Sequence, residues 1–409
     1  MKDRRDFVKQ VIGGATVAAA YGILPSSRAL GANDRVRIGV IGVGDRGTQI
    51  LKAALQCQNA QVVALSDVYT KRLEAAKQLV PEARTYADFR QLLDQKDVDA
   101  VLIATPQHQH ALNFVPAIQA GKDVYQEKTM AFNPDHARRM RKAFEGSNRI
   151  VQIGVQSTSG PAIGPVSDFL KQNRMGAITA IHTHMFRNAP YGGWKRAIPA
   201  DCDLSNVNWK AFQGEAQEHA WDPNRYINWR FYWDYAGGNV FENMVHQVGF
   251  WYKALGLQIP RAVTMAGNNY LCPEMQLPDT MDVSMDHHEK ILFTWNSMFA
   301  NKHYGETQDE LLGTHGTVSR DQYDGTTFTP EGKGEQQSMQ LTASDKAADR
   351  SSTVAHMQNF VDCVRGRKEP NCPFEIGYRS AIACQMAITS YRLGRTVKWD
   401  ASTEEIFDS

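Results

Sequence analysis

Short apolar runs alternate with amphipathic stretches over the first part of the chain. The strand-like runs cover residues 36–41, 61–65, 100–104, 123–126 and 150–155. The stretches between them have helical periodicity, as Ile50, Leu51, Ala54 and Leu55 illustrate. Strands that alternate with helices in this way predict a parallel sheet covered by helices.

The pattern changes after about residue 160, where the strand-like runs lose their regular helical spacers. Residues 177–186 and 291–299 predict long strands, and the polar segment 321–350 predicts a loop or hairpin. A helical pair is expected at 356–365 and 378–393. The expected fold class is therefore α/β: a parallel domain, then an α/β domain with a mostly antiparallel open sheet.

Length and charge limit the classes of function. A chain of 409 residues exceeds the usual single core, which favours two domains. A net charge of +1 gives no field that would recruit nucleic acid or an acidic membrane, so a small uncharged substrate suits the balance better. No apolar run reaches the roughly 20 residues that span a bilayer. The six cysteines are expected to be buried thiols, with a Cys363–Cys372 bridge as the alternative.

The first 32 residues differ in character from the rest. Arg4 and Arg5 precede Phe7, a mildly apolar run covers 11–24, and small residues follow it. This order is typical of a signal peptide, and the paired arginines resemble the twin-arginine export signal. We expect residues 1–32 to direct export to the periplasm or the medium. The alternative is a plain amphipathic or disordered N-terminus.

A glycine motif follows the first expected strand and opens a helix. It has the sequence Gly42-Val43-Gly44-Asp45-Arg46-Gly47. Such glycines permit a tight turn, close approach of a pyrophosphate, and packing of helix on strand. Asp67 ends the second strand, where a carboxylate accepts ribose hydroxyls and repels a 2′-phosphate. NAD is therefore favoured over NADP, although Lys71 and Arg72 nearby keep NADP as the alternative.

Two further strand ends carry polar motifs. Thr105, Pro106 and His110 follow one strand, and Glu127 and Lys128 follow the next. Together with the glycine motif, they resemble the Gfo/Idh/MocA oxidoreductases. That family has a proline where this chain has Thr129. The C-terminal run 356–399 also resembles secreted members of the family.

The resemblance implies a Rossmann domain over 33–157 and a substrate-binding and oligomerisation domain over 158–409, with C-terminal helices that pack back on the first domain. It implies NAD as cofactor. The cofactor-binding residues are expected to be Gly42, Gly44, Asp45, Arg46, Gly47, Asp67, Thr105, Pro106, His110, Glu127, Lys128 and Gln156.

The same resemblance places Lys128 beside the reacting hydroxyl, where an ammonium stabilises an alkoxide. Glu242 and His246 are four residues apart and share a face if they lie on a helix. His246 suits a general base, and Glu242 suits a group that orients it or binds a hydroxyl. The family usually has Asp and Gly at the positions of Glu242 and Met244. A structural role for His246 is the alternative.

Some of these residues could instead form a metal site. His182 or His184, on a strand, and the pair Glu242 and His246 would supply three ligands with one open position. Coincidental spacing is the commoner explanation, so no metal is expected. The neighbours His287 and His288 would lie on opposite faces of a strand and are expected to be structural or exposed.

Aromatic segments precede the Glu242–His246 motif. Their tryptophans and tyrosines, edged by Arg, Asn and Asp, suit sugar rings with their apolar faces and hydroxyl rims, although a core or an oligomer interface would use them too. The candidate substrate residues are His184, Arg187, Trp194, Lys195 and Arg230.

The expected function is NAD-dependent oxidation or reduction at a secondary hydroxyl of a sugar or glycoside. Because an exported enzyme meets no pool of free NAD, the cofactor is expected to be tightly retained. One alternative is an NAD-assisted glycosidase that works by transient oxidation and elimination, and another is a non-catalytic sugar-binding protein. A homo-oligomer, dimer or tetramer, is expected.

Overall fold

The first half of the chain forms a parallel sheet. The computed structural model describes residues 35–302, 307–332, 337–346 and 352–408, so the expected signal peptide lies outside the described residues. Within them, six parallel strands run in the order β3-β2-β1-β4-β5-β6. They are β1 (Val36–Ile41), β2 (Ala60–Ser66), β3 (Arg84–Tyr86), β4 (Ala100–Ile103), β5 (Asp123–Glu127) and β6 (Val151–Gly154). The order reverses between β1 and β4, where ligands of such sheets bind.

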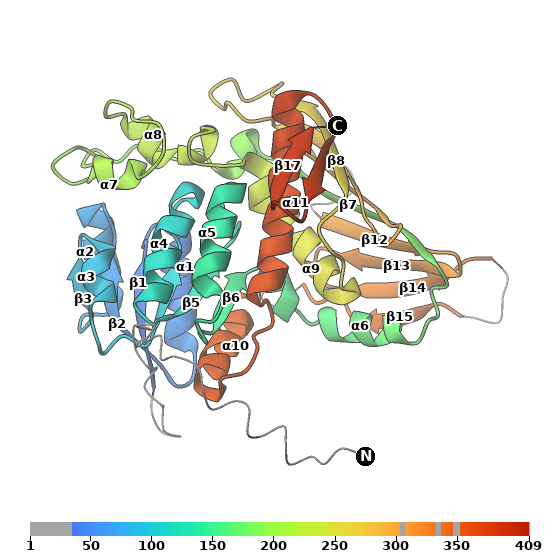
Figure 1. Cartoon of the computed structure of the whole chain (residues 1–409), viewed down its shortest axis with the longest axis horizontal. Helices are drawn as coiled ribbons and strands as arrows, with labels where there is room; N and C mark the ends of the chain where they lie inside the picture. Colours follow the sequence, from blue (N-terminus) through green and yellow to red (C-terminus); the bar gives the residue numbers. More distant parts are fainter. Residues whose placement is uncertain (1–34, 303–306, 333–336, 347–351, 409) are drawn as a thin grey trace, which may run out of the picture.

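Five helices connect these strands and cover the sheet (Figure 1). They are α1 (Asp45–Gln56), α2 (Thr70–Leu79), α3 (Phe89–Leu93), α4 (His110–Gln119) and α5 (Pro134–Phe144). Local signals fix their starts: Asn133 accepts a hydrogen bond from the amide of His136, and Pro134 occupies the first turn of α5.

A broad, mostly antiparallel sheet dominates the second half. The described strands run in the order β15-β14-β13-β12-β7-β10-β9-β8-β16-β17, and β11 pairs with β7. Only the pair of β7 and β10 is parallel among those described. The bounds are β7 (Ile178–Asn188), β8 (Ala262–Asn268), β9 (Thr280–Asp286), β10 (Leu292–Met298), β11 (Ala300–Asn301), β12 (Thr307–Gly313), β13 (Gly316–Asp321), β14 (Thr326–Pro330), β15 (Met339–Thr342), β16 (Val397–Asp400) and β17 (Glu405–Asp408).

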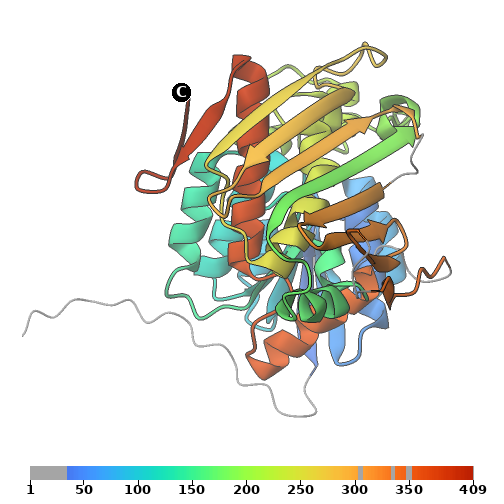
Figure 2. The ribbon, with the colours of Figure 1, turned by 90° about the vertical axis from the view of Figure 1, so that its right-hand side faces the viewer.

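Helices pack on one face of this sheet, and Figure 2 views its other face. Met281, Val283 and Met285 on β9 are buried, while the residues between them are exposed or half-buried. This alternation gives the sheet one apolar face. The described helices of this half are α6 (Ile163–Lys171), α7 (Trp209–Gln213), α8 (Pro223–Ile227), α9 (Val245–Leu255), α10 (Thr353–Gly366) and α11 (Phe374–Leu393), of which α7 and α8 lie beside the first domain (Figure 1).

The two sheets share core elements. Helix α11 runs between them (Figure 1) and contacts β6 of the first sheet and β8 of the second. Helix α10 packs on α1, and its Met357, Phe360, Val361 and Val364 belong to the same apolar cluster as β1. The C-terminal segment therefore completes the core of the first domain.

The predicted fold class is confirmed, with small differences at element ends. Segment 321–350 forms the β14–β15 hairpin within its described residues. The final helices begin earlier than expected, at Thr353 and Phe374. The six cysteines are buried and free. Among the described residues, none of the helices has the length and apolarity needed to cross a bilayer.

Candidate active site

The glycine motif forms a bare backbone turn at the end of β1. Gly42 has a φ of +85°, and an added Cβ would lie 2.9 Å from the carbonyl of Ala104. A Cβ on Gly47 would lie 1.9 Å from the Gly42 oxygen. On Gly44 it would meet only the tip of Arg72, at 3.3 Å. The turn and the N-terminus of α1 therefore suit a dinucleotide diphosphate.

Gly47→Ala is expected to lower the free energy of unfolding by about 1–3 kcal/mol and to weaken NAD binding, because the new Cβ displaces the turn. Gly164→Ala is the matched control: a Cβ there meets no atom within 4 Å. It should be neutral or stabilising by up to about 1 kcal/mol. Thermal unfolding and nucleotide titration measure both variants, and equal behaviour would contradict the role of Gly47.

Asp67 lies at the end of β2, where its position suits a ribose. Its two carboxylate oxygens accept hydrogen bonds from the amides of Val43, at 2.8 Å, and Tyr69, at 2.9 Å. Burial raises the pKa of Asp67, and the charge of Arg72 and these amides oppose the rise. The Arg72 guanidinium lies 5.5 Å from the Tyr69 ring and 5.4 Å from that of Tyr226.

The loops after β4 and β5 are held by side chains behind the cavity wall. The buried His110 ring contacts the carbonyls of Thr105 and Thr129, at 2.9 and 2.7 Å. Glu127 accepts from Arg46 at 2.9 Å and from Gln156 at 3.1 Å. His110 and Gln156, which are predicted cofactor-binding residues, thus hold these loops from behind the cavity wall.

These strand ends open into a cavity of about 710 Å³. One wall comes from the first domain and the other from the segment between β7 and α9. The predicted residues that line it are Gly42, Gly44, Asp45, Arg46, Asp67, Thr105, Pro106, Glu127, Lys128, Trp194, Arg230 and Glu242.

Lys128, Arg230 and Gln107 converge on the carboxylate of Glu242. Lys128 Nζ lies 2.5 Å from Glu242 Oε2 and also donates to the Glu242 carbonyl, at 3.0 Å. Glu242 Oε1 accepts from Arg230 Nε at 3.0 Å and from Gln107 Nε2 at 2.9 Å. Burial alone would raise the pKa of Glu242, but the charges of Arg230 and Lys128 lower it to about 2. Glu242 is thus an ionised anchor for two cations.

Glu242→Gln tests this ion pair through its pH dependence. A lowered pKa means that the carboxylate stabilises the fold above its unfolded pKa of about 4.3 and that this stabilisation is lost as the pH falls towards 2. The wild type should exceed the variant in free energy of unfolding above about pH 4.3, and the gap should close towards pH 2. Urea unfolding across this range measures it; a gap independent of pH would contradict the assignment.

His246 does not line the cavity with Glu242. Glu242 lies in a π-helical turn, Val240–Met244, whereas His246 lies in the first turn of α9. The wider turn changes the register that an uninterrupted α-helix would give. Burial lowers the pKa of His246 well below its usual value, and the charges of Lys128 and Arg46 lower it further. His246 is therefore neutral and close to the ion pair.

Three candidate substrate residues lie away from the cavity. Lys195 forms an ion pair with Glu274 at the surface. Arg187 donates to Asn243 at 2.9 Å and to the Gly192 carbonyl at 3.0 Å, so it supports the wall from behind. His184 stacks on Phe186, with ring centroids 4.7 Å apart on β7.

The cavity wall also contains side chains that are not among the predicted site residues. Arg196 donates to Asp45 at 3.0 Å and so joins the two domains across the cavity. Trp229 lies beneath the Arg230 guanidinium, 4.2 Å from ring centroid to Cζ. Gln107 and Lys210 also line the wall. Arg196, Trp229 and Gln107 are sequence neighbours of predicted site residues, and this proximity is the signal that could have identified them.

The alternative of a three-ligand metal site can be compared with the side chains that the structure describes. Within the described ranges, no group of three or more His, Cys, Asp or Glu side chains is placed to hold a metal ion. His182 is exposed on β7.

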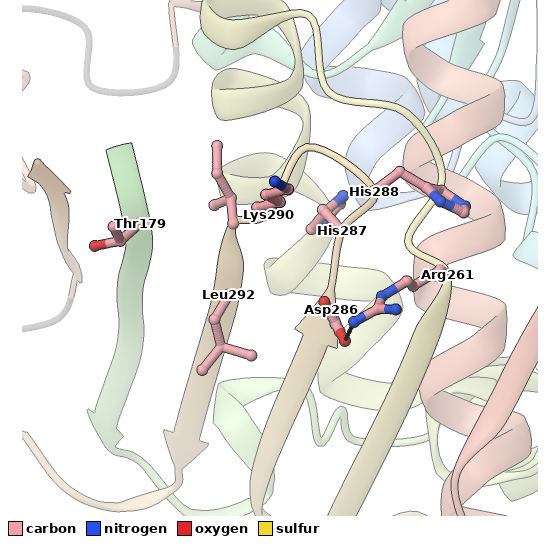
Figure 3. A pocket seen from close by; sticks show the side chains of 8 residues that line it. Thr179, Arg261, Asp286, His287, His288, Lys290 and Leu292 are labelled. Atoms are coloured by element: carbon pink, nitrogen blue, oxygen red, sulfur yellow. Dashed lines mark ion pairs between the residues drawn. The ribbon is translucent and has the colours of Figure 1, made fainter. Parts of the chain in front are cut away.

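A second hollow, of about 400 Å³, lies at one end of the central strands β7 to β10 of the large sheet. Figure 3 shows Arg261 directed at Asp286, with which it forms an ion pair at 2.6 Å. His287 and His288 lie in the turn after β9 rather than on a strand, and His287 is buried against the Gln258 carbonyl, at 3.1 Å. This hollow contains neither the glycine turn nor Lys128, so the larger cavity is the candidate site.

A doubly wound sheet, a glycine turn, a ribose-side carboxylate and a half-buried lysine at one cavity are typical of dinucleotide-dependent oxidoreductases. The chain belongs to the Gfo/Idh/MocA oxidoreductase family. The family's NAD-binding Rossmann model matches residues 36–155, and its C-terminal alpha/beta model matches 209–399. The predicted NAD cofactor and enzyme class are thereby confirmed.

Curated relatives match over part of the chain. An inositol 2-dehydrogenase of Klebsiella pneumoniae (strain 342) is 35% identical over 122 residues, 29% of this chain and 36% of that protein. A glycosyl hydrolase family 109 protein of Stenotrophomonas maltophilia (strain K279a) is 35% identical over 129 residues, 29% of this chain and 28% of that protein. The chain thus matches well under half of these relatives' own lengths.

Solved structures match over nearly the whole chain. Levoglucosan dehydrogenase, in complex with NADH and levoglucosan, has a TM-score of 0.70 at 15% identity, covering 92% of this chain and 99% of that one. The WlbA dehydrogenase from Bordetella pertussis, in complex with NADH and UDP-GlcNAcA, has a TM-score of 0.69 at 20% identity, covering 90% and 99%. At these identities the likeness establishes the shared fold.

Proposed function

We propose that the protein oxidises a secondary hydroxyl of a sugar or glycoside to a ketone, or reduces the ketone in the reverse direction, using a tightly held NAD. The Lys128 ammonium carries this proposal, because it lies in the cavity between the glycine turn and an aromatic wall. Relatives named for inositol and levoglucosan support a polyhydroxylated substrate.

Lys128, His246 and Glu242 have separate roles in the proposed reaction. When bound, the nicotinamide supplies a two-electron hydride acceptor at C4. In the oxidative direction the carbinol C–H bond breaks and its hydrogen leaves with both electrons, while the hydroxyl proton leaves separately. Lys128 stabilises the developing alkoxide. We assign the acceptor role for this proton to His246, which is neutral and lies close to the Lys128–Glu242 ion pair, behind the cavity wall. Glu242 holds Lys128 in place.

Retention of the cofactor is part of the same proposal. The Arg196–Asp45 ion pair, which joins the domains across the cavity, supports it. Export through the signal in residues 1–32 would give retention a purpose, because the twin-arginine route carries folded proteins. The cofactor could then be loaded before export.

The test is an absorbance spectrum of the exported protein before and after adding a panel of sugars and glycosides. A band near ~340 nm that appears or bleaches with a sugar is the expected result. Release of an aglycone from a glycoside, with no net change in that band, would instead favour the glycosidase chemistry. His246→Asn should slow the band's change without weakening sugar binding. If no such band appears and denaturation releases no nucleotide, the proposal of a retained cofactor is refuted.

A further inference from the structure

The charges that line the cavity do not balance, although those of the whole chain nearly do. Seven Lys and Arg side chains and five Asp and Glu side chains line it. Asp45 pairs with Arg196 and Glu127 pairs with Arg46. Glu242 faces two cations, Lys128 and Arg230. A positive charge is therefore left over at the inner end of the cavity, beside the proposed reaction centre.

Arg230 is the cation whose hydrogen-bonding capacity is least used. Its Nε donates to Glu242, while its two terminal nitrogens donate to no residue that the structure describes. The side chain is 26% exposed, so these donors are only partly hydrated. Its guanidinium is held over the Trp229 ring. A planar guanidinium with both terminal nitrogens available matches a carboxylate in a bidentate manner.

Glu242 is not available as an acceptor for the terminal nitrogens of Arg230. Its Oε1 already accepts from Arg230 Nε and from Gln107, and its Oε2 accepts from Lys128. Lys128 is engaged by the reacting hydroxyl in the proposed function. A substrate carboxylate would therefore neutralise the surplus charge and fill the remaining donors of Arg230, which a neutral hydroxyl does less well.

We propose that the substrate is a sugar acid whose carboxylate binds the terminal nitrogens of Arg230 while its reacting hydroxyl lies at Lys128. This inference rests on the proposed function and replaces the uncharged substrate that the net charge of the chain favours. The surplus charge is local, and a sum over all residues hides it.

The test uses matched sets of uronic and aldonic acids, their neutral amides and their neutral parent sugars. Calorimetric titration gives binding, and the absorbance near ~340 nm gives turnover. At least one acid should be preferred over its own amide by about 100-fold in kcat/KM. Arg230→Gln should reduce this ratio to near 1. Arg230→Lys should restore only part of it, because lysine keeps the charge but lacks the paired donors.

The ratio of acid to amide cancels general damage to the site, since both compounds use the same enzyme variant. Arg261→Gln, at the exposed ion pair with Asp286, is the control and should leave the ratio unchanged. Equal or better use of the neutral sugars would overturn the sugar-acid inference and leave the oxidoreductase proposal standing. No turnover and no binding with any compound would overturn both.

Discussion

Lys128→Ala is expected to slow hydride transfer by about 100- to 1,000-fold while leaving NAD binding nearly unchanged. The ammonium is the donor placed to stabilise an alkoxide in the cavity. Its removal leaves Glu242 bound to Arg230 and Gln107, so the surrounding structure should persist. Single-turnover absorbance measures the rate, and nucleotide fluorescence measures binding.

Two controls separate chemistry from structure at this position. Lys171→Ala removes an exposed lysine whose ion-pair partner among the described residues is Asp168, and it should not change the rate. A small primary amine added to Lys128→Ala should restore part of the rate if the missing group is the ammonium. Unchanged turnover in Lys128→Ala would remove this lysine from the mechanism.

The largest loss of stability is expected from Asp309→Ala, at about 3–5 kcal/mol. Asp309 is fully buried on β12 and accepts hydrogen bonds from Arg320, Gln247 and Trp251. The variant leaves the Arg320 guanidinium, whose side chain is 7% exposed, with Asp324 as its remaining ion-pair partner. Urea unfolding measures the change.

A double variant and a surface variant test the cause of this loss. Asp309→Leu combined with Arg320→Met removes both buried charges and should recover part of the stability. Asp168→Ala breaks an exposed ion pair and should change stability by less than about 0.5 kcal/mol. A loss below about 1 kcal/mol in Asp309→Ala would show that the network contributes little.

The dinucleotide half of the site could be predicted from sequence because its signals are local. Gly42, Gly47 and Asp67 follow strands that the apolar pattern marks, and parallel strands bring their carboxyl ends to one edge. The Lys128–Glu242 ion pair could not be predicted in this way. Its partners are 114 residues apart, and only the packing of the domains joins them.

The position of some predicted substrate residues away from the cavity has a local cause. Lys195 and Arg196 are neighbours in sequence, yet only Arg196 lines the cavity. The turn before them includes Tyr191, with φ 56°, and Gly192, with φ 63°. This left-handed turn fixes which side chains face inward, and composition does not reveal it. The π-helical turn before α9 likewise leaves no periodic signal, so the spacing of Glu242 and His246 does not reveal their register.

The packing of α10 on α1 bears on biosynthesis. A domain usually folds as soon as its own residues leave the ribosome. Here residues 353–366 supply part of the apolar cluster around β1, so the dinucleotide domain stays incomplete until almost the entire chain has been translated. Nascent chains would therefore carry the glycine turn on an unfinished apolar core, and we expect stable cofactor binding only after translation ends. A quality-control step that senses the finished pocket would thereby sense the finished protein.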